Sequence, residues 1–248
     1  MNKPTVWIYP GLIAIYGSSI DTSPHSHLSM QLIWPLEHSF CQLNGKDIFG
    51  PTLIDSQVSH QLEISEGWIL LIEPKSSLGQ VLTSKLERQE FSTVKNTFPL
   101  LQNKPTQNKD VFQYITPLFQ SLDLDAEQIT SNVCTVKDAR IQSLLTELDQ
   151  CLQGDCIKPS NWRASEVASQ LALSESRFLH LFKEELGIPW RPYILWRRMM
   201  CAIQALINNK SATDAAHVAG FSDSAHLSRT FRNNFGMTIR QALTIFKS

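Results

Sequence analysis

The sequence lacks any apolar run long enough to cross a lipid bilayer. No uninterrupted apolar stretch is longer than that of residues 68–72, whereas a transmembrane helix needs about 20 such residues. The 248 residues include 5 cysteines but no Cys-x-x-Cys pair. An odd number of scattered cysteines is typical of reduced thiols in a cytosolic protein. We therefore expect a cytoplasmic protein with five reduced thiols and no membrane partner.

The sequence also lacks the short motifs that mark several enzyme classes. It contains no Gly-x-Ser-x-Gly nucleophile turn, no Walker phosphate loop and no Gly-x-Gly-x-x-Gly dinucleotide motif. Its acidic residues are scattered along the chain and form no obvious catalytic pair. These absences predict a protein that is not an enzyme, with no catalytic residues and no cofactor.

The net charge of −1 conceals a difference between the two ends of the chain. Residues 1–159 carry 11 Lys and Arg against 17 Asp and Glu, which gives −6. Residues 160–248 carry 11 against 6, which gives +5. A basic C-terminal third is where a polyanionic partner is expected first.

The N-terminal part has the pattern of a β structure. Short runs rich in β-branched and aromatic residues alternate with turn residues, which favours a small barrel or sandwich. Asn44-Gly45 is a strong hairpin signal because both positions tolerate a positive φ. The four clearest runs cover residues 6–9, 12–16, 31–34 and 68–72.

From about residue 109 onward the apolar residues recur at helical spacing. A clear apolar stripe predicts a helix over residues 138–152. We therefore expect a two-domain chain, with a β domain over residues 1–130 and a helical domain over residues 131–248.

The C-terminal third contains an internal repeat. An offset of 48 residues aligns Ala168 with Ala216 and Ser174 with Ser222, and an offset of 49 aligns Gly187 with Gly236. Each copy reads as a short helix, a tight turn and a longer helix. Ser174 and Ser222 are suitable N-caps for the longer helices, and the two glycines are suitable C-terminal residues. A long helix over residues 190–207, about 27 Å in length, would join the two helix–turn–helix copies.

These residues resemble a known family. The segment from about 138 to 246 is similar to the DNA-binding domain of AraC/XylS-type bacterial transcription regulators. The resemblance implies a role that recruits RNA polymerase, most often as an activator. One departure is Ala172, which stands where the first turn of the family usually has glycine. The similarity is carried by residues 167–174, 182–189, 216–222 and most strongly 226–236.

By the family resemblance, the longer helix of each repeat copy is expected to contact DNA bases, and we call these two the reading helices. Helical periodicity separates the inward face of each from its outward face. Phe178, Leu181 and Phe182 fall on one face of the first, and Leu227, Thr230 and Phe231 on one face of the second. We expect Lys183 and Arg232 to contact phosphates. The side chains expected to face base edges are Ser176, Arg177, Leu179, His180, Ser224, Ala225, Ser228 and Arg229.

Three arginines of the joining helix have two interpretations. Arg191, Arg197 and Arg198 could contact phosphate. Surface salt bridges to Glu184 or Glu185 are an equally good explanation of the same residues.

The N-terminal part contains a histidine pattern. His25 and His27 are followed by Gln31 and, further on, by His60. This order resembles the metal site of cupin barrels, in which two histidines, a glutamate and a third histidine surround a cation. Because Gln31 replaces the anionic ligand, we expect these four residues to line an effector pocket without a metal.

The fold class predicted is two-domain α+β, with a cupin-like N-terminal β-barrel and an all-α double helix-turn-helix C-terminal domain. We expect a sequence-specific transcription regulator whose partners are double-stranded DNA, RNA polymerase, a small-molecule effector and a second copy of the chain. The alternative is a metal-dependent cupin enzyme with a helical appendage.

Overall fold

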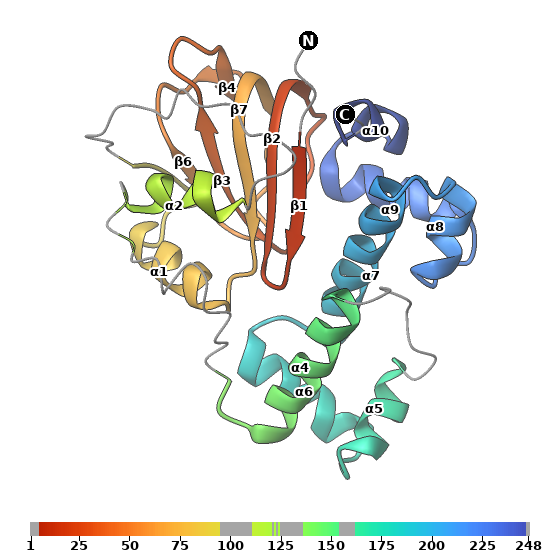
Figure 1. Cartoon of the computed structure of the whole chain (residues 1–248). Helices are drawn as coiled ribbons and strands as arrows, with labels where there is room; N and C mark the ends of the chain where they lie inside the picture. Colours follow the sequence, from red (N-terminus) through yellow and green to blue (C-terminus); the bar gives the residue numbers. More distant parts are fainter. Residues whose placement is uncertain are drawn as a thin grey trace. The chain divides into compact units, whose positions relative to one another are not determined.

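The computed structural model of the chain describes residues 5–94, 111–120, 122, 124, 136–153 and 162–246 (Figure 1). The chain divides into two compact units. One consists of Met1–Val133 with Arg229–Ser248, and the other of Cys134–Ser228. The boundary expected at residues 130/131 lies outside the described residues, and it stays a prediction.

The first unit contains eight described strands. They form one antiparallel sheet in the order β1-β2-β7-β3-β6-β8, and β4 pairs with both β5 and β7. The strands are β1 Thr5–Tyr9, β2 Leu12–Asp21, β3 Met30–Pro35, β4 Cys41–Leu43, β5 Lys46–Asp47, β6 Thr52–Ile54, β7 Leu62–Ile72 and β8 Phe91–Thr93.

The four apolar runs singled out in the sequence lie in β1, β2, β3 and β7, so their assignment as strands is confirmed. Strands β2 and β7 extend beyond the predicted runs because their outer parts pair with each other as far as Asp21 and Glu63. Asn44 and Gly45 join β4 to β5 with φ values of 52° and 72°. Both values fit the tight hairpin turn that was expected there.

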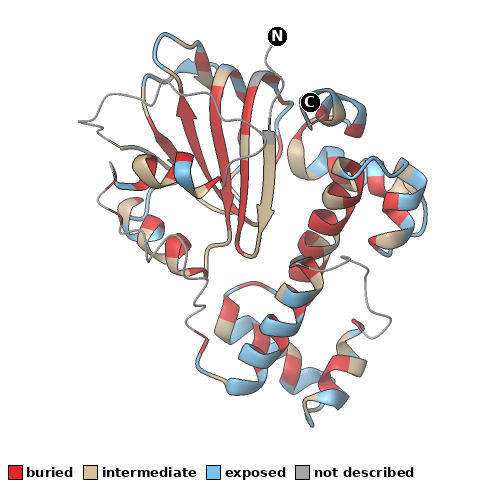
Figure 2. Cartoon of the chain, viewed as in Figure 1, coloured by how far each residue is buried: buried red, intermediate tan, exposed pale blue. Residues whose placement is uncertain are grey.

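The core of this unit lies between the sheet and two helices. Strand β3 is buried along its whole length, as the red central strands of Figure 2 show. Helices α1 (Ser77–Lys85) and α2 (Phe112–Gln120) contribute Leu82 and Phe119 to the same apolar cluster as Trp34 and Trp68. This burial stabilises the sheet because each large apolar side chain contributes about 1.5–3 kcal/mol when fully buried.

The remaining described helices follow the predicted periodicity. The helix expected over 138–152 is α4, and the joining helix α7 begins and ends where the sequence predicted. The helices are α4 Ala139–Gln153, α5 Ala164–Gln170, α6 Glu175–Leu186, α7 Trp190–Ile207, α8 Ala212–Val218, α9 Ser224–Phe235 and α10 Ile239–Phe246.

The structure bears on two expectations, that no segment crosses a membrane and that the cysteines are reduced. Among the described residues, no helix combines the length and apolar character that a membrane crossing requires. Cys41 is a free thiol, but Cys201, buried on α7, is disulfide-bonded. The expectation of five reduced thiols is therefore wrong for Cys201, because spacing along the chain does not reveal which cysteines meet in three dimensions.

Candidate nucleic-acid interface and buried polar centre

The first helix–turn–helix motif consists of α5, a tight turn and α6. The hydroxyl of Ser174 accepts a hydrogen bond from the backbone N–H of Arg177 at 3.3 Å, which confirms Ser174 as the N-cap of α6. Gly187 ends the helix in the left-handed conformation, with φ 71°. Both ends of the first reading helix are thus fixed by residues that the sequence identified.

The second motif consists of α8, a tight turn and α9. Ser211 caps α8 by accepting from the N–H of Asp214 at 3.1 Å. At the start of α9 it is the carboxylate of Asp223 that accepts from the N–H of His226, at 2.7 Å. The prediction that Ser222 caps this helix is therefore wrong by one residue, because α9 begins at Ser224 and Asp223 directly precedes it. Ser222 instead contacts the side chains of Asp223 and His226.

The two turns repeat the same hydrogen bonds. In the first, Leu173 N–H donates to the carbonyl of Ala168 at 2.8 Å, and in the second, Phe221 N–H donates to that of Ala216 at 2.8 Å. The residue preceding each donor has a positive φ, 54° at Ala172 and 73° at Gly220. The internal repeat therefore extends to the backbone, and the first turn places an alanine where a left-handed residue is required.

We expect Ala172→Gly to stabilise the protein. The left-handed conformation costs an L-residue about 1–2 kcal/mol, and the greater entropy that glycine loses on folding offsets about 0.5–1 kcal/mol of that gain. Urea unfolding should therefore show an increase in the free energy of unfolding of up to about 1.5 kcal/mol. The matched change Gly220→Ala should lower stability. A destabilising Ala172→Gly would contradict the strain assigned to this turn.

An aromatic cluster supports the first reading helix from behind. The ring of Phe182 lies 4.9 Å from that of Trp190 and 5.3 Å from that of Tyr193, centre to centre. Phe178 also contacts Trp190, at 5.1 Å, and both phenylalanines are fully buried. The inward face predicted for α6 is thus confirmed, and its packing against α7 fixes which residues point outward.

The side chains expected to meet DNA lie on the outward faces of α6 and α9. On α9, Leu227 and Phe231 are buried as expected, whereas Thr230 is only half-buried. The exposed candidates are Ser176, Arg177, His180, Lys183, Ala225, Ser228, Arg229 and Arg232, and the half-buried candidates are Leu179 and Ser224.

Two arginines of α7 have structural partners that the sequence did not suggest. The guanidinium of Arg197 is buried and donates to the carboxylate of Asp149 on α4 at 2.7 Å. Arg198 donates to the carbonyl of Ala219 at 3.0 Å, also contacts the carbonyl of Gly220, and lies 4.3 Å from the ring centre of Phe221. Arg198 therefore holds the turn of the second motif from outside that motif.

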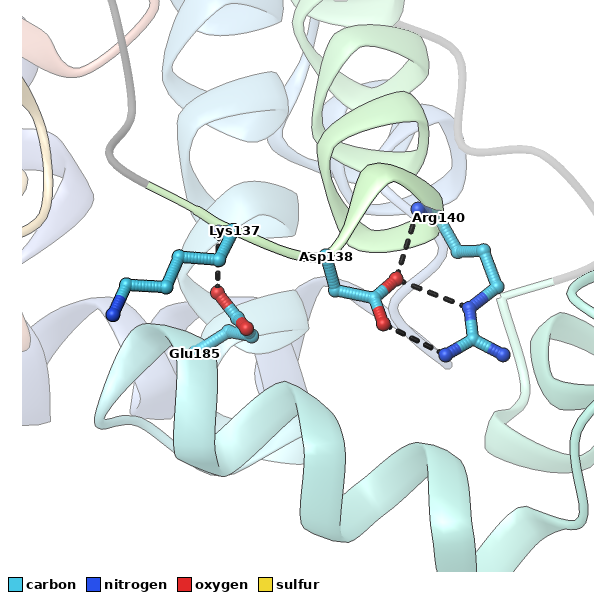
Figure 3. A network of polar contacts seen from close by, with 4 residues as sticks. All are labelled: Lys137, Asp138, Arg140 and Glu185. Carbon is cyan, nitrogen blue, oxygen red and sulfur yellow. Dashed lines mark hydrogen bonds and ion pairs between the residues drawn. The ribbon is translucent and has the colours of Figure 1, made fainter.

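The glutamates of α6 do not pair with these arginines. Glu185 accepts a hydrogen bond from the backbone N–H of Lys137 at 2.7 Å, just before α4 begins (Figure 3). Glu184 lies 4.0 Å from His180 on its own helix. The interpretation of Arg197 and Arg198 as partners of Glu184 or Glu185 is therefore wrong, since both arginines turn toward other elements.

The start of α4 is fixed by a local network, also drawn in Figure 3. Asp138 accepts from the backbone N–H of Arg140 at 2.9 Å and from its guanidinium at 3.0 and 2.7 Å. This pairing lowers the pKa of Asp138 to about 2. The carboxylate consequently stays charged where it caps the helix.

The four polar residues singled out in the N-terminal part come together in the first unit. His25 and His60 form an antiparallel bridge, each backbone N–H donating to the other's carbonyl at 3.0 and 2.9 Å. Gln31 on β3 brings its Oε1 to 2.9 Å from Nε2 of His27 and 3.1 Å from Nε2 of His60. All four side chains are buried, and they define what we call the polar centre.

The histidines of the polar centre are neutral. Burial, together with the smaller effect of the neighbouring His60, lowers the pKa of His25 to about 4 and that of His27 to about 3. Burial also lowers the pKa of His60. Ser29, to which no pattern in the sequence pointed, places its carbonyl and its hydroxyl oxygen each 2.9 Å from Nδ1 of His27.

A family described as "Helix-turn-helix domain" matches residues 167–244. The virulence regulon transcriptional activator VirF of Yersinia enterocolitica is 34% identical over 106 residues, which are 42% of this chain and 36% of VirF. The transcriptional activator RhaS of Klebsiella pneumoniae is 35% identical over 117 residues, which are 46% of this chain and 38% of RhaS. The chain thus matches little more than a third of the length of these relatives.

A solved structure resembles the chain over both units. ToxT from Vibrio cholerae has a TM-score of 0.51 at 13% sequence identity, and the match covers 99% of this chain and 98% of ToxT. The likeness shows the fold, a two-domain α+β arrangement with an N-terminal antiparallel sheet and a C-terminal helical domain. The fold class predicted from the sequence is confirmed. The curated relatives are named as transcriptional activators and not as enzymes, so the cupin-enzyme alternative has no support from them.

Proposed function

We propose that the chain is a sequence-specific DNA-binding transcription regulator of the AraC/XylS type. The observation that carries the proposal is the pair of motifs related by an internal repeat, α5–α6 and α8–α9, each with an outward polar face. The outward face of a single amphipathic helix is usually an ordinary solvated surface. Two such faces related by an internal repeat favour a ligand that both of them contact. B-DNA offers such a ligand with two successive major grooves.

We assign base reading to the outward residues of α6 and α9. Arg229 can bond O6 and N7 of a guanine with both arms of its guanidinium, and His180 can donate to a purine N7. Apolar contacts with thymine methyl groups suit Leu179 and Ala225. The remaining members of this set are Ser176, Arg177, Ser224 and Ser228.

We assign phosphate contact to Lys183 and Arg232. Each lies about one turn beyond the centre of its reading face, where a helix in the major groove approaches the backbone of the duplex. Both side chains are exposed. Cationic side chains at these positions contribute affinity that depends on salt and not on sequence.

We assign the regulatory role to the N-terminal β domain, with 130/131 as its boundary. The polar centre formed by His25, His27, Gln31 and His60 is its candidate effector site, because it gathers buried polar side chains in one place. By family resemblance, we infer that the regulator acts as an activator through RNA polymerase and pairs with a second copy of itself.

Selection of bound duplexes from random DNA, with the full-length protein, tests the proposed function. We expect an enriched motif with two parts whose centres lie about 10–10.5 base pairs apart, one for each reading helix. A second inverted copy of the motif would indicate that two chains bind together. Recovery of unenriched sequences at moderate salt would contradict sequence-specific recognition.

A further inference from the structure

We propose that the polar centre binds a divalent transition-metal ion of the zinc class, with one ring nitrogen each from His25, His27 and His60 and the Oε1 atom of Gln31 as ligands. The inference rests on the proposed effector role of this centre for its regulatory meaning, but metal binding itself is tested without DNA. It departs from the expectation of a metal-free site, which rested on the absence of a carboxylate at Gln31.

The ligand atoms already lie close together. One nitrogen from each of the three histidines falls within 4.8 Å of the other two. Gln31 Oε1 stands 2.9 Å from Nε2 of His27 and 3.1 Å from Nε2 of His60. Ligands of a tetrahedral zinc ion are about 2.0–2.1 Å from the metal, which places them roughly 3.3 Å apart. Small side-chain rotations therefore convert this cluster into a four-ligand site.

The tautomer of each imidazole is set by the backbone. Nδ1 of His25 faces the carbonyl of Ser23 at 2.9 Å, that of His27 faces the carbonyl of Ser29 at 2.9 Å, and that of His60 faces the carbonyl of Val58 at 3.0 Å. A carbonyl only accepts hydrogen bonds, so Nδ1 carries the proton in all three rings. The lone pair is then on Nε2, and a hydrogen-bonded Nδ1–H is the usual support of a metal-binding histidine.

This arrangement places acceptors against one another. The Nε2 lone pairs of His27 and His60 face the amide oxygen of Gln31, which is a third acceptor at hydrogen-bond distance. A cation at the centre satisfies every acceptor at once. The rival is a Gln31 amide turned by 180°, with its NH₂ group donating to both rings.

The ligand types select the class of ion. Imidazole nitrogens suit zinc, copper, iron and nickel, whereas calcium and magnesium prefer sets of oxygen ligands. All four ligands are neutral, so the ion keeps its full double charge in a buried site. We therefore expect binding to be weaker than in a site with a carboxylate and to strengthen when one is introduced.

The test uses the full-length protein, stripped with a chelator and then titrated with Zn²⁺ or Co²⁺. We expect one ion per chain by elemental analysis after desalting, a rise in melting temperature with added Zn²⁺, and the intense visible absorption of tetrahedral Co²⁺. His27→Ala and His60→Ala should lose all three signals. His38→Ala, which removes a fully exposed histidine of the same unit, is the matched control and should bind metal as the parent does.

Gln31→Glu keeps the proposal testable if the alanine variants fail to fold. A carboxylate attracts a divalent ion much more strongly than an amide oxygen does, so affinity should rise by at least about tenfold. The turned-amide rival expects no stoichiometric metal in the parent protein. Absence of bound metal in the folded parent, or an unchanged affinity in Gln31→Glu, would overturn the proposal. The selection of bound duplexes from random DNA is a separate experiment. A protein that binds no metal but still selects its DNA sequence would contradict only the metal site.

Discussion

Replacing Arg229 by alanine should weaken binding to the preferred DNA sequence by about 1–3 kcal/mol and relax selection at one base position. Arg229 is exposed near the middle of α9, on the side opposite the buried Leu227 and Phe231. A guanidinium at the centre of a reading face reaches base edges, where its two parallel hydrogen bonds recognise guanine. The measurement is a titration of the variant on the selected duplex and on a scrambled one.

Arg232→Ala is the matched control for this prediction. Arg232 is also exposed, one turn further along the same helix, so its loss removes the same charge without removing a base contact. We expect both duplexes to bind more weakly by the same factor, with the salt dependence reduced by about one ion. An Arg229→Ala protein that binds as tightly and as selectively as the parent would refute the assignment of α9 as a reading helix.

The second large effect concerns the ion pair that joins α4 to α7. Asp149→Ala should destabilise the protein by about 3–5 kcal/mol, because it leaves a buried guanidinium without its carboxylate. Arg197 is only 2% exposed and its Nη2 lies 2.7 Å from Asp149 Oδ1. The free energy of unfolding in urea measures the effect. DNA affinity of the protein that remains folded should change little, since neither residue lies on a reading face.

Two further variants test whether the loss of stability comes from a buried charge left without its partner. In Asp149→Leu combined with Arg197→Met, no charge is left unpaired, and most of the lost stability should return. Glu184→Ala removes a carboxylate from an exposed contact with His180, 4.0 Å away, and should have little effect because exposed pairs contribute about 0–1 kcal/mol. If Asp149→Ala and Glu184→Ala lowered the free energy of unfolding equally, the burial of Arg197 would not explain the strength of its ion pair.

Much of the helical part could be predicted from the sequence because its signals are local. An apolar residue every three to four positions defines the buried face of α6, and α7 lies where its pattern predicted, at Trp190–Ile207. The departure of Ala172 from the glycine usual in the first turn of the family also pointed to a position that takes a positive φ. The N-cap of α9 was missed by one residue because Ser222 and Asp223 are both good caps, and only the backbone decides between them.

Contacts between distant positions could not be predicted in the same way. Asp149 and Arg197 are separated by 48 residues, and Arg198 lies 21 residues before the carbonyl of Ala219 to which it donates. No periodicity links such positions. The histidine pattern suggested a cluster, but it revealed neither the bridge between His25 and His60 nor the carbonyls that fix the ring tautomers. Those details decide what the polar centre can bind.

The position of Arg198 also limits how the second motif can be transplanted. Residues 211–236 look like a self-contained cassette, yet part of what holds their turn comes from α7, through the contacts of Arg198 with the carbonyl of Ala219 and the ring of Phe221. A chimera that grafts only the cassette onto another scaffold would leave those contacts behind. The smallest portable piece therefore begins within the preceding helix, and the joining helix is a structural component of the second motif as well as a spacer.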